Sequence, residues 1–167
     1  MSRNEDTLTT TVTDHYGHDH DRLDNLLEQF EHRNETAPAA ASAFFAEFKA
    51  GLERHIGWEE EILFPIFENK TGMREVGPTA VMRWEHTQIK DFLLKIHGRL
   101  AQQQRALKED VQALKDLLQM HNHKEENILY PAVDSMLEPE NRARIFAEME
   151  KYPDGHGPCR TGQDPKN

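Results

Sequence analysis

The stretch that decides the fold is HIGWEEEILFP, His55–Pro65, because it returns further along the chain as HNHKEENILYP, His121–Pro131. The histidine, the glutamates four and five positions after it, the Ile-Leu pair, the aromatic residue and the proline all coincide, with an offset of 121 − 55 = 66. The same offset aligns HDRLDNLL, which begins at His20, with HTQIKDFL, which begins at His86, since 86 − 20 = 66. The same 66-residue offset therefore aligns two separate pairs of segments, and this predicts a duplicated unit of two helices.

Apolar residues recur at the spacing of one helix face, as Leu23, Leu27 and Phe30 illustrate. Breakers and turn-forming residues divide these stretches into four predicted helices. They cover His15 to about His32, an alanine-rich stretch that ends at Phe67, Thr79 to Leu100, and a segment that starts at Arg105 or later. The expected connections are Asn34 to Pro38, Asn69 to Pro78 and a loop near Gly98 to Gln104.

The pattern predicts an all-α fold, namely an antiparallel up-and-down four-helix bundle built from two similar αα-hairpins. We expect a flexible N-terminal arm over residues 1–13, the bundle over 14–136, and a short extra helix with an irregular C-terminal tail over 137–167. The extra helix should run from Pro139 through Glu150. Pro65 and Pro131 fall late in their helices, where a proline is expected to kink or help to end the helix.

Composition narrows the function. A chain of 167 residues fits one domain, and its net charge of −10 argues against a nucleic-acid or anionic-membrane partner. No apolar run approaches the roughly 20 residues that a membrane span needs. The N-terminal MSRNEDTLTTTVTD lacks the apolar core of a signal peptide, so we expect a soluble, cytoplasmic protein. With Cys159 as the only cysteine and ten histidines, metal ligands must be nitrogen and oxygen.

Residues four apart on a helix project from one face, so His55 with Glu59, and His121 with Glu125, can each meet one metal cluster. Imidazole and carboxylate together suit iron, manganese or zinc, and the lack of thiolates removes the usual structural zinc and iron–sulfur cages. By helical phase we assign Glu60, Glu61 and Glu126 to the flanks or to solvent, and His123 to the outer face. Three further histidines lack a partner motif: His32, His97 and His156.

The first helix offers three histidines. His15 and His20 both lie at the border of the apolar stripe, whereas His18 points away from it. The 66-residue repeat favours His20 and leaves His15 in reserve. Each histidine alone is more often an ordinary boundary residue than a ligand, and a single His-x-x-x-Glu pair is common surface patterning. Their recurrence in one register favours a metal site. We interpret Trp58 and Trp84 as core or rim aromatics, and Met82 and Tyr130 as core residues.

With these motifs the chain resembles the hemerythrin-like, or HHE cation-binding, family, in which an H-x-x-[LI] helix and an H-x-x-x-E-E-x-x-[LF]-[FY]-P helix occur twice. The similarity covers about His15 to Met136. It implies two non-haem irons that the two glutamates bridge and the histidines cap. The family ligands align with His20, His55, Glu59, His86, His121 and Glu125.

One departure concerns the third helix. Oxygen-carrying hemerythrins usually place two histidines four residues apart there, whereas His86 here has Met82 before it and Lys90 after it. A fifth non-bridging ligand is left open between His15, water and none. This pattern argues against reversible oxygen carriage in particular and towards redox or sensing chemistry.

The resemblance implies a protein that binds or senses a small diatomic molecule or peroxide, such as oxygen, nitric oxide or hydrogen peroxide, at the iron pair. A different class is an iron-handling, ferroxidase-like or iron–sulfur repair protein. The third is a metal-free helical interaction module. No Ser-His-Asp order, phosphate loop or C-x-x-C motif indicates another enzyme class, and the pattern does not specify the oligomeric state.

Overall fold

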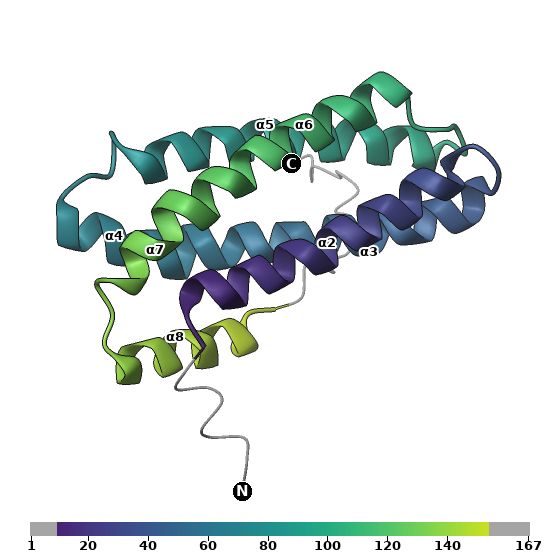
Figure 1. Cartoon of the computed structure of the whole chain (residues 1–167). Helices are drawn as coiled ribbons and strands as arrows, with labels where there is room; N and C mark the ends of the chain where they lie inside the picture. The colour runs from purple at the N-terminus through teal and green to yellow at the C-terminus, as the bar shows by residue number, and fades with distance from the viewer. Residues whose placement is uncertain (1–9, 154–167) are drawn as a thin grey trace, which may run out of the picture.

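The computed structural model describes residues 10–153, and these residues form helices and no strand. Figure 1 shows long helices that run lengthwise through the molecule and the short C-terminal helix beneath them at one end. In chain order the elements are α2 (Val12–Asn34), α3 (Pro38–Trp58), η1 (Glu59–Leu63), α4 (Phe64–Thr71), α5 (Pro78–Ala101), α6 (Lys108–Lys124), η2 (Glu125–Leu129), α7 (Tyr130–Asp134) and α8 (Pro139–Lys151). The prediction of an all-α fold is confirmed.

The helix ends differ from the predicted ones by a few residues. Helix α2 begins at Val12, because Thr11 and Asp14 form a capping box that satisfies the first free backbone N–H groups. The predicted boundary between residues 13 and 14 therefore lies inside this helix. Residues 1–9 of the predicted arm, and the tail with His156 and Cys159, lie outside the described residues. No helix in the described range is long and apolar enough to cross a membrane.

The prolines do not end their helices where they stand. Pro65 and Pro131 are each the second residue of an α-helical segment that continues a π-helical one. In these π turns the N–H of Phe64 donates to the carbonyl of Glu59, and the N–H of Tyr130 donates to that of Glu125. A proline in a regular α-helix would clash with the carbonyl four residues before it, and the wider turn relieves that clash. Both π turns begin at a glutamate predicted to bind metal.

The core consists of two apolar clusters with a polar layer between them. Along α2, His20 lies between Tyr16 of one cluster and Leu23 of the other, and along α5, His86 lies between Met82 and Ile89 in the same way. The cluster nearer the α2–α3 loop includes Leu23, Leu27, Phe30, Phe45, Phe48, Ile89, Leu93 and Leu114. The cluster nearer α4, α7 and α8 includes Tyr16, Trp58, Leu63, Phe64, Met82, Tyr130 and Phe146. Trp84, predicted as core or rim, is instead 63% exposed.

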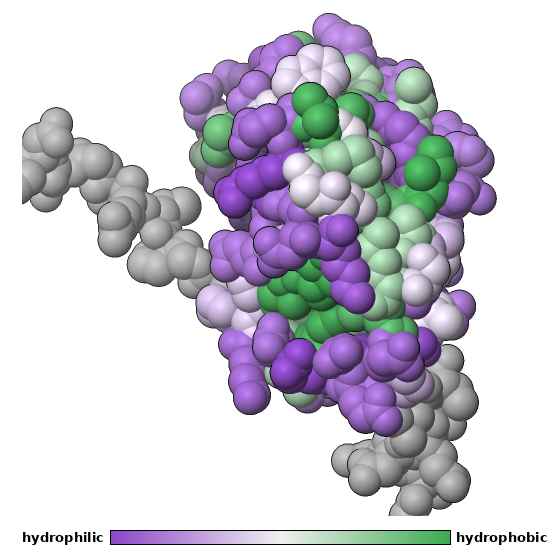
Figure 2. Space-filling view, turned by 90° about the vertical axis from the view of Figure 1, so that its left-hand side faces the viewer, coloured by the Kyte–Doolittle hydropathy of each residue, from purple (hydrophilic) through white to green (hydrophobic). Residues whose placement is uncertain are grey.

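Helix α8 lies beneath the other helices, against η1, near the end of the molecule where α4 and α7 lie (Figure 1). Figure 2 views that end and shows apolar surface gathered within a rim of polar side chains. A groove of about 360 Å³ there has apolar walls from Ile62, Ile66, Met136, Leu137 and Ile145. Buried Ile145, Phe146 and Met149 join α8 to the second cluster, so this helix helps to close the polar layer from that side.

Candidate metal centre

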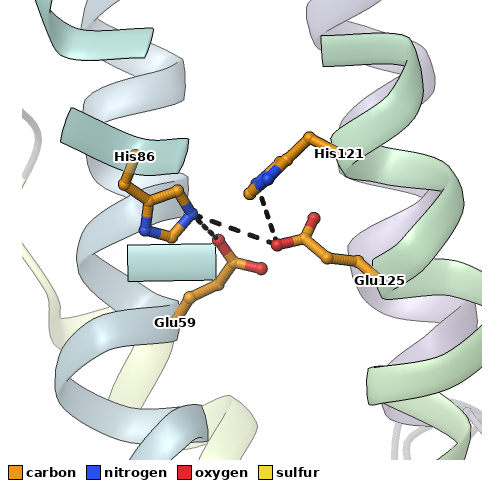
Figure 3. Close-up of side chains that lie close together, drawn as sticks. All are labelled: Glu59, His86, His121 and Glu125. Carbon is orange, nitrogen blue, oxygen red and sulfur yellow. Dashed lines mark ion pairs between the residues drawn. The ribbon is translucent and has the colours of Figure 1, made fainter. Parts of the chain in front are cut away.

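The structure brings all six predicted ligands together in the polar layer, and all six are buried. Ligand atoms of Glu59, His86, His121 and Glu125 lie within 4.8 Å of one another, and so do those of His20, His55 and Glu125. Figure 3 shows the first group, with the imidazoles of His86 and His121 turned towards the carboxylates of Glu59 and Glu125. The two copies of the 66-residue repeat thus supply the histidines of two adjoining halves of one site.

Each glutamate turns one oxygen towards each half. Oε2 of Glu59 lies 3.1 Å from Nε2 of His86, and Oε1 of Glu125 lies 2.9 Å from Nε2 of His121. In the other half, Oε1 of Glu59 lies 3.7 Å from Nε2 of His55. Oε2 of Glu125 completes the pattern at 3.4 Å from Nε2 of His20. A carboxylate with its two oxygens in two ligand sets has the arrangement of a bridging ligand.

Every one of the four histidines uses its other ring nitrogen to contact a second carboxylate. The pairs, from Nδ1 to a carboxylate oxygen, are His20–Glu126 at 2.6 Å, His55–Asp19 at 2.9 Å, His86–Glu60 at 2.8 Å and His121–Glu85 at 2.8 Å. Such a contact fixes the ring orientation and leaves Nε2 as the atom available to bind a metal. The Nε2 atoms are the ones that face the glutamates.

The sequence interpretation missed Asp19 and Glu85, which precede His20 and His86 directly. A signal was present, because the two acidic residues obey the same offset, 85 − 19 = 66. Glu60 and Glu126 were placed on the flanks or in solvent, and they do flank the ligands, but they also hold His86 and His20 in position. The repeat therefore includes the residues that orient the ligands.

Proton affinities in the site reflect this packing. Burial disfavours the charged form of His55, yet the charge of Glu59 and the bond to Asp19 raise the pKa of His55 to about 10. For His86, burial is likewise outweighed by the nearby carboxylates of Glu59 and Glu60, and its pKa rises to about 9. The pKa of Glu59 lies well below its usual value because His55 and His86 outweigh the effect of burial. In the absence of metal, imidazolium therefore balances carboxylate.

The residues fit a metal ion on grounds of geometry and donor chemistry. Oε2 of Glu59, Nε2 of His86 and Oε1 of Glu125 are buried and have no hydrogen-bond partner among the described residues. Buried polar atoms are normally satisfied, so three unsatisfied atoms within 4.8 Å of one another mark a place for a cation. Imidazole and carboxylate donors suit first-row metals such as iron, manganese and zinc.

The remaining candidates lie elsewhere. The reserve ligand His15 is in neither ligand group, and its ring stacks on Phe146 with 4.6 Å between ring centroids. It lies five residues before His20, which turns it away from that face of α2. His18 and His123 are exposed, as predicted. Tyr130, interpreted as ordinary core, has a buried ring but directs its hydroxyl at Glu59 and Glu125.

A buried set of imidazoles and carboxylates inside a helical protein defines a candidate metal-binding site. The family model described as hemerythrin HHE cation binding domain matches residues 11–133, and the chain belongs to that family. Comparisons with curated proteins and with solved structures gave no significant match. The predicted family is thereby confirmed.

Proposed function

We propose that the protein holds a non-haem di-iron centre and uses it to bind or sense a small diatomic molecule or a peroxide. The observation that carries the proposal is the placement of Glu59 and Glu125, each of which presents one oxygen to each pair of histidines. When bound, an iron pair supplies accessible redox states and open coordination positions. Manganese and zinc are the substitutes that the same donors accept.

The proposed scaffold is an antiparallel up-and-down four-helix bundle made of the α2–α3 and α5–α6 hairpins. It is supported by the 66-residue repeat and by the way that the four helices deliver one histidine each: His20, His55, His86 and His121. Carboxylate and histidine ligands that project inward from facing helices are a known way for a bundle to hold two irons. The cytoplasmic location stays a prediction.

The half of the site at His86 and His121 is the proposed place for the small ligand. Neither half has enough protein donors to fill an octahedral metal, so the surroundings of the two halves decide between them. The ring of Phe64 stacks on His86, with 5.7 Å between centroids and 7° between planes. Phe64 and Met82 belong to the same buried apolar cluster. An apolar wall excludes water and suits a small uncharged molecule such as oxygen or nitric oxide.

The test is anaerobic loading with iron(II), elemental analysis, and optical spectra on exposure to oxygen, nitric oxide and hydrogen peroxide. We expect about two irons per chain, as in bundle di-iron sites, and a spectral change with at least one of the three reagents. Glu125→Ala should reduce both the iron content and the spectral change. Glu61→Ala, at an exposed glutamate of η1, should change neither of these two quantities. Loaded protein with no iron, or with one, would refute the di-iron proposal.

Iron handling is the second candidate, and a groove between α2 and α6 favours it. The groove measures about 590 Å³, reaches His20 and has carboxylates from Asp21, Asp24, Glu28, Asp116 and Glu126 along its walls. These carboxylates outnumber the one lysine of the groove, Lys115, and such an excess of negative charge raises the local concentration of cations and speeds their association.

Neutralising the groove tests this candidate. The variant Asp24→Asn/Glu28→Gln should take up iron(II) several-fold more slowly at low salt, with little effect at high salt. The matched control, Glu47→Gln/Glu140→Gln, removes the same charge from exposed positions outside the groove. Equal uptake rates in both variants and the unmodified protein would eliminate the groove as an iron path.

A further inference from the structure

The hydroxyl of Tyr130 lies among the ligand atoms of one half of the site. It is 2.6 Å from Oε1 of Glu59 and 3.0 Å from Oε2 of Glu125. It is also 3.3 Å from Nε2 of His55 and 3.5 Å from Nε2 of His20. These are the atoms that the second ligand set turns towards a metal, so the phenolic oxygen is part of that set by position.

Hydrogen bonding alone does not account for this position. A phenol has one proton to donate, yet two carboxylate oxygens lie within bonding distance of the same oxygen. Donor atoms at about 2.1 Å from an octahedral metal are about 3 Å from their neighbours, which matches the spacing between the Tyr130 oxygen and its surroundings. Phenolate is moreover an oxygen donor that proteins use for ferric iron.

Comparison of the two copies of the repeat shows that the phenolic oxygen of Tyr130 has no equivalent in the other half of the site. The residue 66 positions before Tyr130 is Phe64, since 130 − 66 = 64, and its ring faces His86 in the other half. Residue 82, which has the same relation to Tyr16, is Met82. The two halves therefore share histidines and glutamates but differ in their aromatic residues, and a hydroxyl reaches the ligands in one half only.

We propose that Tyr130 binds the metal held by His20 and His55 through its phenolate oxygen, and so makes the two metal positions chemically different. The inference rests on the proposed di-iron centre. On binding, the phenolic O–H bond breaks, the oxygen bonds to the ferric ion, and the proton leaves to solvent with no change in oxidation state. The tyrosine takes up a coordination position in its own half and directs small ligands to the half at His86 and His121.

The experiment is resonance Raman spectroscopy of the ferric, iron-loaded protein, with excitation in its visible absorption band. Ferric phenolate gives a visible charge-transfer band and enhanced tyrosine ring modes, which shift when the chain carries ring-deuterated tyrosine. The chain has three tyrosines, Tyr16, Tyr130 and Tyr152, so variants at the other two serve as matched controls. Tyr16 is also fully buried, with its ring 4.9 Å from that of Tyr130, and its hydroxyl has no hydrogen-bond partner among the described residues.

We expect label-sensitive ring modes in the unmodified protein, in Tyr16→Phe and in Tyr152→Phe, and their loss in Tyr130→Phe with iron still bound. If Tyr130→Phe does not hold iron, retention of the modes in both control variants assigns them to Tyr130 by elimination. The proposal is overturned if iron-loaded protein shows no tyrosine modes, or if they disappear with Tyr16→Phe or Tyr152→Phe. Elemental analysis separates the two proposals, because iron at about two per chain without tyrosine modes refutes the ligand and leaves the di-iron centre standing.

Discussion

Metal loading should release protons, because two of the candidate ligands, His55 and His86, are protonated at pH 7 when the site holds no metal. The pKa of His55 is about 10 and that of His86 about 9, while their glutamate partners have lowered pKa values. A histidine binds metal only in its neutral form. At pH 7 these two imidazoles must therefore give up their protons before they bind, whereas Glu59 and Glu125 are already ionised.

The magnitude follows from these values. His55 and His86 together release two protons per chain on loading at pH 7, and His121, whose pKa is also raised, adds to that number. For two released protons, the overall binding constant rises about a hundredfold for each pH unit, or about 2.7 kcal/mol. The binding constant rises in this way from neutral pH up to about pH 9, where His86 is deprotonated even in the metal-free protein. The contribution of His55 to the rise ends near pH 10 for the same reason.

An anaerobic iron(II) titration in weakly buffered solution with a pH indicator measures the released protons directly. The same titration at pH 7, 7.5 and 8 gives the slope of the binding constant. His123→Gln is the control, because this exposed histidine lies outside both ligand groups and its replacement should leave the proton count unchanged. Stoichiometric iron binding with no proton release, and with an affinity independent of pH, would refute the imidazolium–glutamate description of the site.

Other variants test single contacts. His121→Ala should lower metal affinity at least ten- to a hundredfold and His123→Ala should not, by elemental analysis after dialysis against a chelator; the reverse order would show that the helical phase is wrong. Glu126→Gln should weaken binding by about ten- to a hundredfold, because His20 loses the carboxylate at its Nδ1, and unchanged retention would count against that role. Asp134→Ala removes three hydrogen bonds to the first turn of α2 and should cost about 1–3 kcal/mol, measured as a lower urea midpoint; an unchanged midpoint would contradict it. Metal-loaded protein should be about 2.7 kcal/mol more stable than metal-free protein at a free metal concentration a hundred times the dissociation constant, and coincident calorimetric melting curves with metal bound would place the ions on the surface.

The duplicated pattern was sufficient to predict which six side chains gather in the buried polar layer, because repetition in one register is far more specific than any single motif. The positions of His20, His55, His86 and His121 follow from the offset and from ordinary helical geometry. The contacts of Glu60 and Glu126 with histidines were not predicted, for a different reason. Helical phase describes how a residue faces its own helix, whereas Glu126 acts on His20 of another helix, and no single-helix projection contains that contact.

Tyr130 was missed because the helix is not regular at that point. In an α-helix the residue five positions after Glu125 lies about 140° away from it, on the flank of the site. The π turn η2 pairs the N–H of Tyr130 with the carbonyl of Glu125 and brings the two side chains to the same face. The sequence shows a proline after an aromatic residue, which predicted only a kink or a helix end. The wider π turn could be recognised only in the structure.

The contacts at Nδ1 also connect the two hairpins in a reciprocal way. Asp19 and Glu85 each orient a histidine within their own hairpin, whereas Glu60 and Glu126 each reach across to the opposite one. A lone hairpin would therefore complete both halves of the site only by pairing with an identical copy about a two-fold axis. The two hairpins of such a pair necessarily have the same residue at every position. Once both hairpins belong to one polypeptide, each position can change alone, and a tyrosine can stand in one half while a phenylalanine stands in the other.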